Sequence, residues 1–374
     1  MNRRRGYAMA LAVSVLVSGV GAARPTPAPS PTPSPTPSPS ASQSDGTLHI
    51  LTYRGYAEYG GVSPKVNWVG TFEKETGCRI ARLDTVQTAE EMATRVTQRN
   101  YDVITAGPVL AGRLIEGKQV QPIDPAKVSD YKDLDERFRD MTTVSGKVYG
   151  VPYLWGYHEY VYDSGKVRGT GVGQVFASDR TSLRDSPLTI ADAALAEGSV
   201  KEPYELSEAE LGKVMTMLER HKGRGYWQNP IDLVKGFATG ALDYAQVTPY
   251  HRLLLQKAGK PIKTISTRKT TGWADSWMLG ANVPDTTCAY RWLNWVTAAD
   301  AQRDAAAWAG LAPANDKACK GRAREMCRTY GVGEDKRMAR VEFAVRPPGG
   351  CQGEDGECTD YAAWTERWQK LVAE

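Results

Sequence analysis

Residues 47–107 alternate between apolar strand-like segments and amphipathic helical segments, and this order restricts the fold more than any other feature of the chain. The apolar alternation over 47–53, "RIARLD" and "YDVITAG" predict three buried strands. "VNWVGTFEKETGC" has apolar residues at helical spacing before Gly77, and "TAEEMATRVTQRN" opens with a threonine cap followed by acids. Strand, helix, strand, helix, strand predicts an α/β fold with parallel pairing.

Length and charge restrict the class further. A chain of 374 residues exceeds what one hydrophobic core usually holds, so we expect two lobes. The formal charge of +4 is matched by the four arginines Arg3, Arg4, Arg5 and Arg24, and the rest of the chain is neutral. A neutral body argues against a nucleic-acid partner.

The N-terminal segment predicts export. Three arginines precede a short apolar run and the small residues "VGAA", which is the pattern of a secretory signal peptide over 1–23, cleaved near Ala22 or Ala23. An uncleaved membrane anchor is the alternative, although the run is short for a span. Residues 24–46 alternate Pro with Ser and Thr, which predicts a disordered, extended linker. It is either a tether from a surface or a passive tail.

The cysteines fit the oxidising environment that export implies. An even number of cysteines in an exported chain predicts disulfides rather than a metal site, because no C-x-x-C spacing or histidine cluster accompanies them. The two close pairs are assigned to local bridges, which leaves one long-range pair. The predicted bridges are Cys319–Cys327, Cys351–Cys358 and Cys78–Cys288.

The later sequence suggests that the chain passes between two lobes. "VYGVPYLWGYHEYVYD", residues 148–163, is aromatic without a helical period and predicts a strand leaving the first lobe. Helices are expected near 206–222 and 230–240, and strands near 243–248 and 261–266. The stretch "TTGWADSWMLG", residues 270–280, then combines a tryptophan, an acid and an apolar run.

Several motifs occur in an order that resembles one family. They are "FEKETGC", "YDVITAG", "GVPYLWG", "SPLTIADAAL", "TGWADSWM", "CAYRWLNWV" and "APANDKAC". Together they resemble the periplasmic spermidine/putrescine-binding proteins of ABC importers, in the disulfide-containing branch. The resemblance implies a two-lobed periplasmic-binding-protein fold of type II with the ligand between lobes joined by a hinge. It implies lobe 1 at 47–152 and 275–310, lobe 2 at 153–274, and a C-terminal segment, 311–374, packed across both.

The resemblance also implies a cleft of aromatic and acidic side chains. Aromatic faces attract ammonium groups and cover methylene chains, and carboxylates accept charge-assisted hydrogen bonds from the ammonium ends. The matching positions here are Tyr53, Tyr56, Asp192, Trp273 and Asp275. Each also has a plainer interpretation, such as core packing for Trp273 and a helix cap for Asp192.

Other family positions differ, which leaves the ligand open. Gly107 stands where the family often has serine, and Thr248 stands near an expected second tryptophan. The ligand is then a polyamine, a smaller diamine, another organic cation or a cationic amino-acid derivative, unless the receptor is degenerate. Trp227 is interpreted as a loop anchor.

No enzyme signature accompanies these motifs. The sequence contains no G-x-S-x-G, phosphate loop or metal cluster, so we expect a binding protein without a cofactor rather than an enzyme. The expected partners are a small cationic ligand and a membrane permease, and the expected state is a monomer outside the cytoplasm. The alternatives are a sensor that reports ligand to a membrane partner and a receptor for another small solute.

Overall fold

The computed structural model describes residues 46–61, 63–168, 171–221, 223–281, 287–344 and 358–373. The predicted signal peptide, residues 24–45 of the predicted linker, and Cys351 lie outside these ranges. Among the described residues, no helix combines the length and the apolar run needed to cross a membrane.

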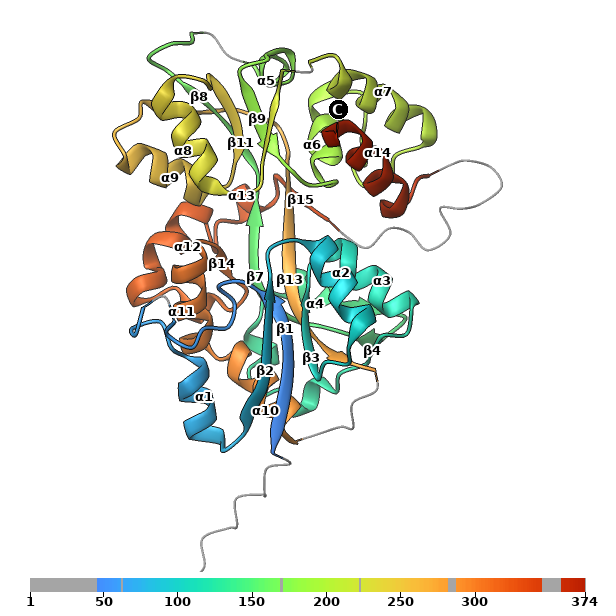
Figure 1. The fold of residues 1–374 in the computed structure, drawn as a ribbon, viewed down its shortest axis with the longest axis vertical. Helices are drawn as coiled ribbons and strands as arrows, with labels where there is room; N and C mark the ends of the chain where they lie inside the picture. Colours follow the sequence, from blue (N-terminus) through green and yellow to red (C-terminus); the bar gives the residue numbers. More distant parts are fainter. Residues whose placement is uncertain are drawn as a thin grey trace, which may run out of the picture. The chain divides into compact units, whose positions relative to one another are not determined.

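The predicted alternation forms one part of a mixed sheet (Figure 1). β1 (Thr47–Tyr53) pairs in parallel with β2 (Arg79–Val86) and β3 (Val103–Ala106), as predicted, with α1 (Val69–Thr76) and α2 (Ala89–Gln98) as connections. The order across the described strands is β14–β7–β13–β3–β1–β2, and β4 and β15 also pair with β13. These further strands are β4 (Val120–Gln121), β7 (Val151–Tyr157), β13 (Thr270–Gly280), β14 (Ala312–Pro313) and β15 (Val341–Phe343).

Helices cover both faces of this sheet because β1 is apolar on both sides. Leu48 and Ile50 pack in one core with Phe72 of α1, whereas Leu51 packs in another with Met92 of α2. Burial on both faces is typical of parallel strands. The other helices of this lobe are α3 (Pro108–Glu116), α4 (Glu136–Met141), α10 (Thr287–Thr297), α11 (Ala299–Ala309), α12 (Arg324–Tyr330) and α13 (Asp335–Met338), with short 3₁₀ turns and the hairpin β5 (Thr143–Val144) and β6 (Lys147–Val148).

A second sheet organises the other lobe. Its described strands run in the order β10–β9–β11–β8–β12, with β9 parallel to its neighbours and β8 antiparallel to β11 and β12. The strands are β8 (Glu159–Asp163), β9 (Thr181–Arg184), β10 (Gly225–Trp227), β11 (Tyr244–Val247) and β12 (Ile262–Ile265). The helices are α5 (Val172–Ala177), α6 (Thr189–Glu197), α7 (Glu208–Glu219), α8 (Pro230–Thr239) and α9 (Pro249–Lys257). The segments predicted near 206–222, 230–240, 243–248 and 261–266 correspond to α7, α8, β11 and β12.

The chain passes between the sheets along paired strands. β7 leaves the larger sheet and continues through His158 into β8, and β12 leads back into β13. Figure 1 shows β7 and β13 side by side as they approach the smaller sheet, in agreement with their antiparallel pairing. Residues 153–157 of β7 and 270–274 of β13 belong to strands of the larger sheet, although the boundaries expected from the sequence assign both ranges to lobe 2. As domain limits, those boundaries remain predictions.

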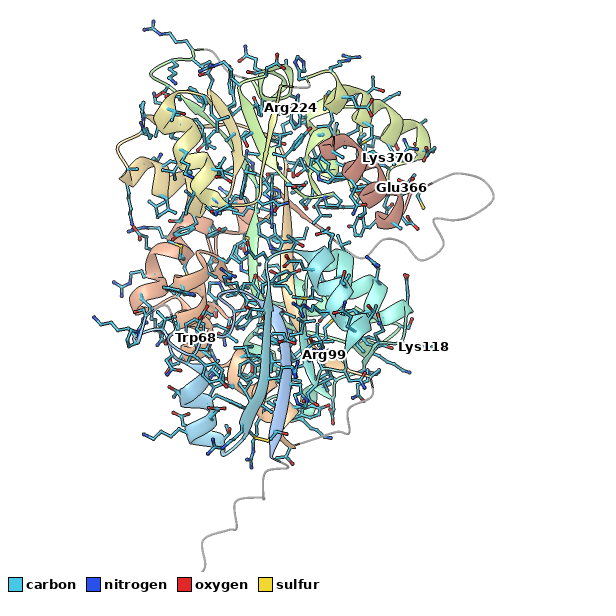
Figure 2. All side chains as sticks on the ribbon, viewed as in Figure 1. Trp68, Arg99, Lys118, Arg224, Glu366 and Lys370 are labelled. Atoms are coloured by element: carbon cyan, nitrogen blue, oxygen red, sulfur yellow. A yellow bond between two sulfur atoms is a disulfide. The ribbon has the colours of Figure 1, made fainter. Side chains whose placement is uncertain are left out.

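The C-terminal segment contributes to both lobes. β14 and β15 belong to the larger sheet, whereas α14 (Tyr361–Ala373) packs against the core of the smaller lobe through Trp364 and Trp368. Both indoles are nearly inaccessible, at 0% and 2% exposure. On the exposed side, Glu366 and Lys370 form an ion pair of 2.7 Å one turn apart (Figure 2). This apolar stripe explains the helical spacing of the tryptophans in the sequence.

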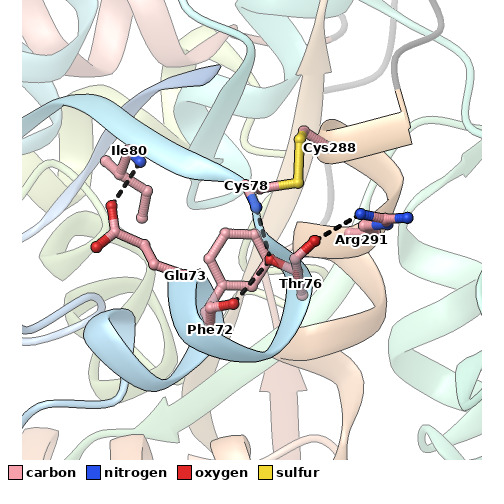
Figure 3. The surroundings of a disulfide bond; sticks show 7 residues. All are labelled: Phe72, Glu73, Thr76, Cys78, Ile80, Cys288 and Arg291. Atoms are coloured by element: carbon pink, nitrogen blue, oxygen red, sulfur yellow. Dashed lines mark hydrogen bonds between the residues drawn. A yellow bond between two sulfur atoms is a disulfide. The ribbon is translucent and has the colours of Figure 1, made fainter. Parts of the chain in front are cut away.

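Two of the predicted disulfides are present. Cys78–Cys288 joins the start of β2 to α10 across 210 residues, and Cys319–Cys327 closes a local loop. Figure 3 shows the long-range bridge beside the end of α1, where Arg291 Nη1 donates to Thr76 O at 2.6 Å. Disulfide and hydrogen bond therefore fasten the first α/β unit to a helix distant in sequence. The third predicted bridge, Cys351–Cys358, includes Cys351 and lies outside the described residues.

Candidate functional site

A cavity of about 320 Å³ is lined by strand ends and helix starts from both sheets. From the larger sheet come Tyr53 at the end of β1, Gly107 after β3, and β13. From the smaller sheet come Arg184 at the end of β9 and Thr248 after β11. Carboxyl ends of parallel strands are where α/β proteins usually bind ligands, and the volume suits a small molecule.

Trp273 and Asp275 enter this cavity together because they are two residues apart on β13. Alternate residues of a strand share a face, so the W-x-D spacing directs both side chains the same way. Trp273 lies opposite Gly156 of β7, and an irregular register follows Asp275. A Cβ at Gly107 would lie only 2.8 Å from Asp275 Oδ1. The carboxylate therefore uses space that a serine side chain, the residue the resemblance implied at this position, would need.

Asp275 is an acid held away from solvent. It is 5% exposed, and Tyr56 Oη donates to its Oδ2 at 2.5 Å. Burial raises the pKa of Asp275 to about 6, against the lowering effects of the Tyr56 hydrogen bond, the Arg184 charge and the Trp273 side chain. Burial disfavours the charged form of a carboxylate, so this group gains from a cation brought into the cavity.

The two predicted tyrosines form one wall beside Asp275. Tyr53 and Tyr56 are in edge contact with ring centroids 5.6 Å apart, and both line the cavity. Burial raises the pKa of both phenols, so both remain neutral hydrogen-bond donors. Four of the five predicted ligand residues are thus brought together.

Asp192, the fifth predicted residue, does not line the cavity. It lies on α6 with 1% exposure, where its Oδ2 is 2.9 Å from His158 Nδ1 and accepts from Gln246 Nε2 at 2.7 Å. The acid from this segment that does line the cavity is Asp185, whose carboxylate accepts from Gln228 and Trp368. The physical reason is the helix: α6 begins at Thr189 and turns Asp192 into the protein interior.

The structure also adds residues that the sequence prediction missed. Arg184 extends over Trp273, with its guanidinium carbon 4.5 Å from the ring centroid. Trp227 and His251 contribute a further aromatic wall, with ring centroids 5.1 Å apart. Burial lowers the pKa of His251 to about 3, which keeps it neutral. The available signal was "TSLRDSP", in which two charged residues stand at the end of a short β-branched and polar stretch before a proline.

Gly156 provides the room in which the Trp273 ring lies. A Cβ at Gly156 would meet Trp273 Cζ2 at 2.8 Å and Cη2 at 2.9 Å. Gly156→Ala is therefore expected to displace the indole and lower the free energy of unfolding by about 1–3 kcal/mol, measured by urea denaturation. Gly212→Ala on α7 is the control, because its Cβ meets nothing within 4 Å and alanine favours helix. Equal midpoints for Gly156→Ala and the parent would contradict this packing argument.

Metal binding has no candidate in the part of the chain that the structure describes. No three His, Cys, Asp or Glu side chains there are gathered so that they could share an ion. The cavity is therefore best described as aromatic walls around a small number of charged groups: Arg184, Asp275, Asp185 and Glu90. Such a site can bind and orient an organic ion.

Comparisons with known proteins agree with this description. A family model described as "Bacterial extracellular solute-binding protein" matches residues 67–323. The spermidine/putrescine-binding periplasmic protein of Salmonella typhimurium is 22% identical over 318 residues, covering 81% of this chain and 86% of that protein. A structure described as a spermidine/putrescine ABC transporter from Listeria monocytogenes aligns with a TM-score of 0.68 at 17% identity, covering 87% of this chain and 98% of that one.

A second solved structure has the same fold. The Atu4243 GABA receptor aligns with a TM-score of 0.68 at 17% identity, again covering 87% of this chain and 98% of that one. The resemblance and the two-lobed periplasmic-binding fold expected from the sequence are confirmed.

Proposed function

Because the chain belongs to the bacterial extracellular solute-binding protein family, we propose that it is the receptor of an ABC importer for a small solute carrying a protonated amine. Members of the family are solute-binding receptors of ABC transporters, and curated relatives are periplasmic. That the solute carries a protonated amine is inferred from the side chains that line the cavity. Structural similarity at 17% identity supports the fold, whereas the ligand has to be inferred from the residues of this cavity.

The observation that carries the proposal is that Asp275 and Trp273 line the cavity together. An acid whose charge is disfavoured by burial gains most from a cation at close range, since both lose water together. The indole beside it offers an apolar surface to the methylene groups of the solute. Tyr56 fixes the carboxylate through its 2.5 Å hydrogen bond. A neutral sugar could donate hydroxyl hydrogen bonds to this carboxylate, but it would leave the negative charge without a counter-charge.

The names of the relatives support an amine without selecting one. Spermidine and putrescine appear in the names of two similar proteins and GABA in a third, and all of these solutes carry an ammonium group at neutral pH. Polyamines therefore remain members of the proposed ligand class. In our proposal Tyr53, Tyr56, Trp273 and Asp275 contact the solute, and Asp192 acts indirectly.

Capture would proceed by closure of the lobes about the β7–β8 and β12–β13 crossings. Closure requires that the solute contact both lobes more favourably in the closed state, and the cavity is lined from both sheets. We propose that a permease binds the closed monomer. The signal peptide 1–23 would export the chain, and the linker 24–46 would hold the receptor away from a surface.

The test is thermal unfolding and calorimetry of the full chain against a panel of solutes. The panel contains putrescine, spermidine, straight-chain ω-amino acids, choline, and two neutral sugars as controls. At least one amine is expected to raise the melting temperature, because a ligand at about 100 times its Kd stabilises the folded state by roughly 2.7 kcal/mol. Stabilisation by a sugar but by no amine would overturn the proposal.

A further inference from the structure

The Arg184 guanidinium is the feature of this cavity that a receptor for simple polyamines does not need. It lies over the indole of Trp273, on the face where a ligand cation would otherwise stack. Its backbone is fixed on both sides, since its N–H donates to Gln246 Oε1 at 2.9 Å and its carbonyl accepts from Thr189 Oγ1 at 2.8 Å. These bonds hold the backbone of Arg184 between β11 and α6, and the side chain itself contacts Trp273 and His158.

A buried relay orients this side chain. Arg184 Nη1 lies 3.1 Å from His158 Nε2, and His158 Nδ1 lies 2.9 Å from Asp192 Oδ2. Burial lowers the pKa of His158, so the imidazole is neutral; with its proton on Nδ1 it donates to Asp192 and accepts from the guanidinium. Asp192 is thereby a positioning residue for Arg184, which gives the predicted acid a role behind the cavity wall.

Arg184 lacks an anion among the described residues. No carboxylate there lies within ion-pair distance of the guanidinium, and its one side-chain hydrogen bond is the contact to His158. Asp275 is near enough to influence Arg184 electrostatically but does not pair with it. A guanidinium presents several N–H donors in a planar fork that fits a carboxylate, and a partly buried charge without a partner is costly. The remaining donors are available to a ligand.

The starts of two helices contribute to the lining of the cavity. α3 begins after Gly107 and α6 after Leu188, and neither has a side-chain cap. Residues at both helix starts line the cavity. The N-terminus of a helix carries partial positive charge and favours an anion nearby. The start of α6, close to Arg184 in the sequence, adds to the positive potential there, whereas the start of α3 lies beside Asp275, since a Cβ at Gly107 would be 2.8 Å from Asp275 Oδ1. The part of the cavity around Arg184 therefore suits a negative group, while Asp275 suits a positive one.

We propose that the solute is a small zwitterion, an amino acid whose ammonium group binds Asp275 and whose carboxylate binds Arg184. This rests on the proposed amine-binding function and narrows its ligand class. A diamine of the same length would bring a second ammonium toward the guanidinium, where like charges repel. A cavity of about 320 Å³ has room for a compact solute of this kind.

The experiment compares straight-chain ω-amino acids with the diamines of matching chain length, by calorimetry on the full chain. The best amino acid is expected to bind about tenfold or more tightly than its matched diamine. Arg184→Gln should abolish that preference and leave diamine binding equal or stronger. Arg180→Gln is the control, since it removes the same charge from an exposed residue paired with Asp243 and should keep the preference.

The outcomes separate the two proposals. If the parent chain binds a diamine as tightly as the matched amino acid, or if Arg184→Gln keeps the preference, the zwitterion proposal is overturned and amine binding stands. If no amine of either kind binds, the proposed function itself fails and the zwitterion proposal fails with it. The comparison on the parent chain decides the question even if Arg184→Gln does not fold.

Discussion

Replacing Asp275 by asparagine is expected to weaken binding of the amine solute about a hundredfold, because a buried charge pair loses about 2–5 kcal/mol when one partner is removed. Asparagine keeps the size of the side chain and can still accept from Tyr56, so the loss reports the charge alone. Calorimetry with the tightest amine of the panel measures the effect.

The melting temperature of Asp275→Asn distinguishes a loss of ligand binding from a loss of folding. The raised pKa of Asp275 means that its ionised form is disfavoured in the folded state at neutral pH. Asp275→Asn removes that cost, so its melting temperature should equal or exceed that of the parent. A variant that binds poorly because it is misfolded would show the opposite.

Two other acids serve as comparisons for Asp275→Asn. Glu90→Gln, at an exposed part of the cavity lining, should change affinity by less than about threefold, since exposed charges interact weakly through water. Asp192→Asn should have an intermediate effect because it acts through His158 and Arg184. Equal losses for Asp275→Asn and Glu90→Gln would mean that only the general potential of the cavity matters.

Much of the fold could be predicted because its signals are local. The β1–β3 unit follows from apolar periodicity, a threonine cap at Thr88 and a glycine at Gly77 with φ of 73°. The crossings between lobes could not be located as well. Residues 148–163 are mostly apolar and aromatic, and β7 and β8 are separated only by His158. No proline, glycine pair or polar turn marks the point at which one strand leaves its sheet for the other.

The candidate site was predictable to the extent that its parts are close in sequence. Trp273 and Asp275 share a face because they are two residues apart, a relation visible in the sequence. Arg184 becomes informative only beside Trp273 and His158, which come from different strands. An arginine at a strand end is usually a solvated surface group, so composition and spacing alone favour that interpretation. Only the tertiary structure shows that Arg184 lies beside Trp273 and His158.

Lowering the pH should weaken binding of the solute, because it protonates the carboxylate of Asp275. Binding a cation requires the ionised form of Asp275, and burial raises its pKa to about 6. The solute is therefore expected to bind about tenfold more weakly at about pH 5 than at about pH 8, since most of the carboxylate is protonated at the lower value. An aliphatic amine, with a pKa of about 10, keeps its charge across this range.

The other titratable groups around Asp275 do not explain such a change. Tyr53 and Tyr56 stay neutral because their pKa values are raised, and His251 stays neutral because its pKa is lowered to about 3. Burial also lowers the pKa of His158. Calorimetry across the pH range should give an affinity that falls with acid in the parent and is nearly flat in Asp275→Asn. A slope that persists in Asp275→Asn would assign the titration to another group, and a parent affinity independent of pH would show that Asp275 is not the amine partner.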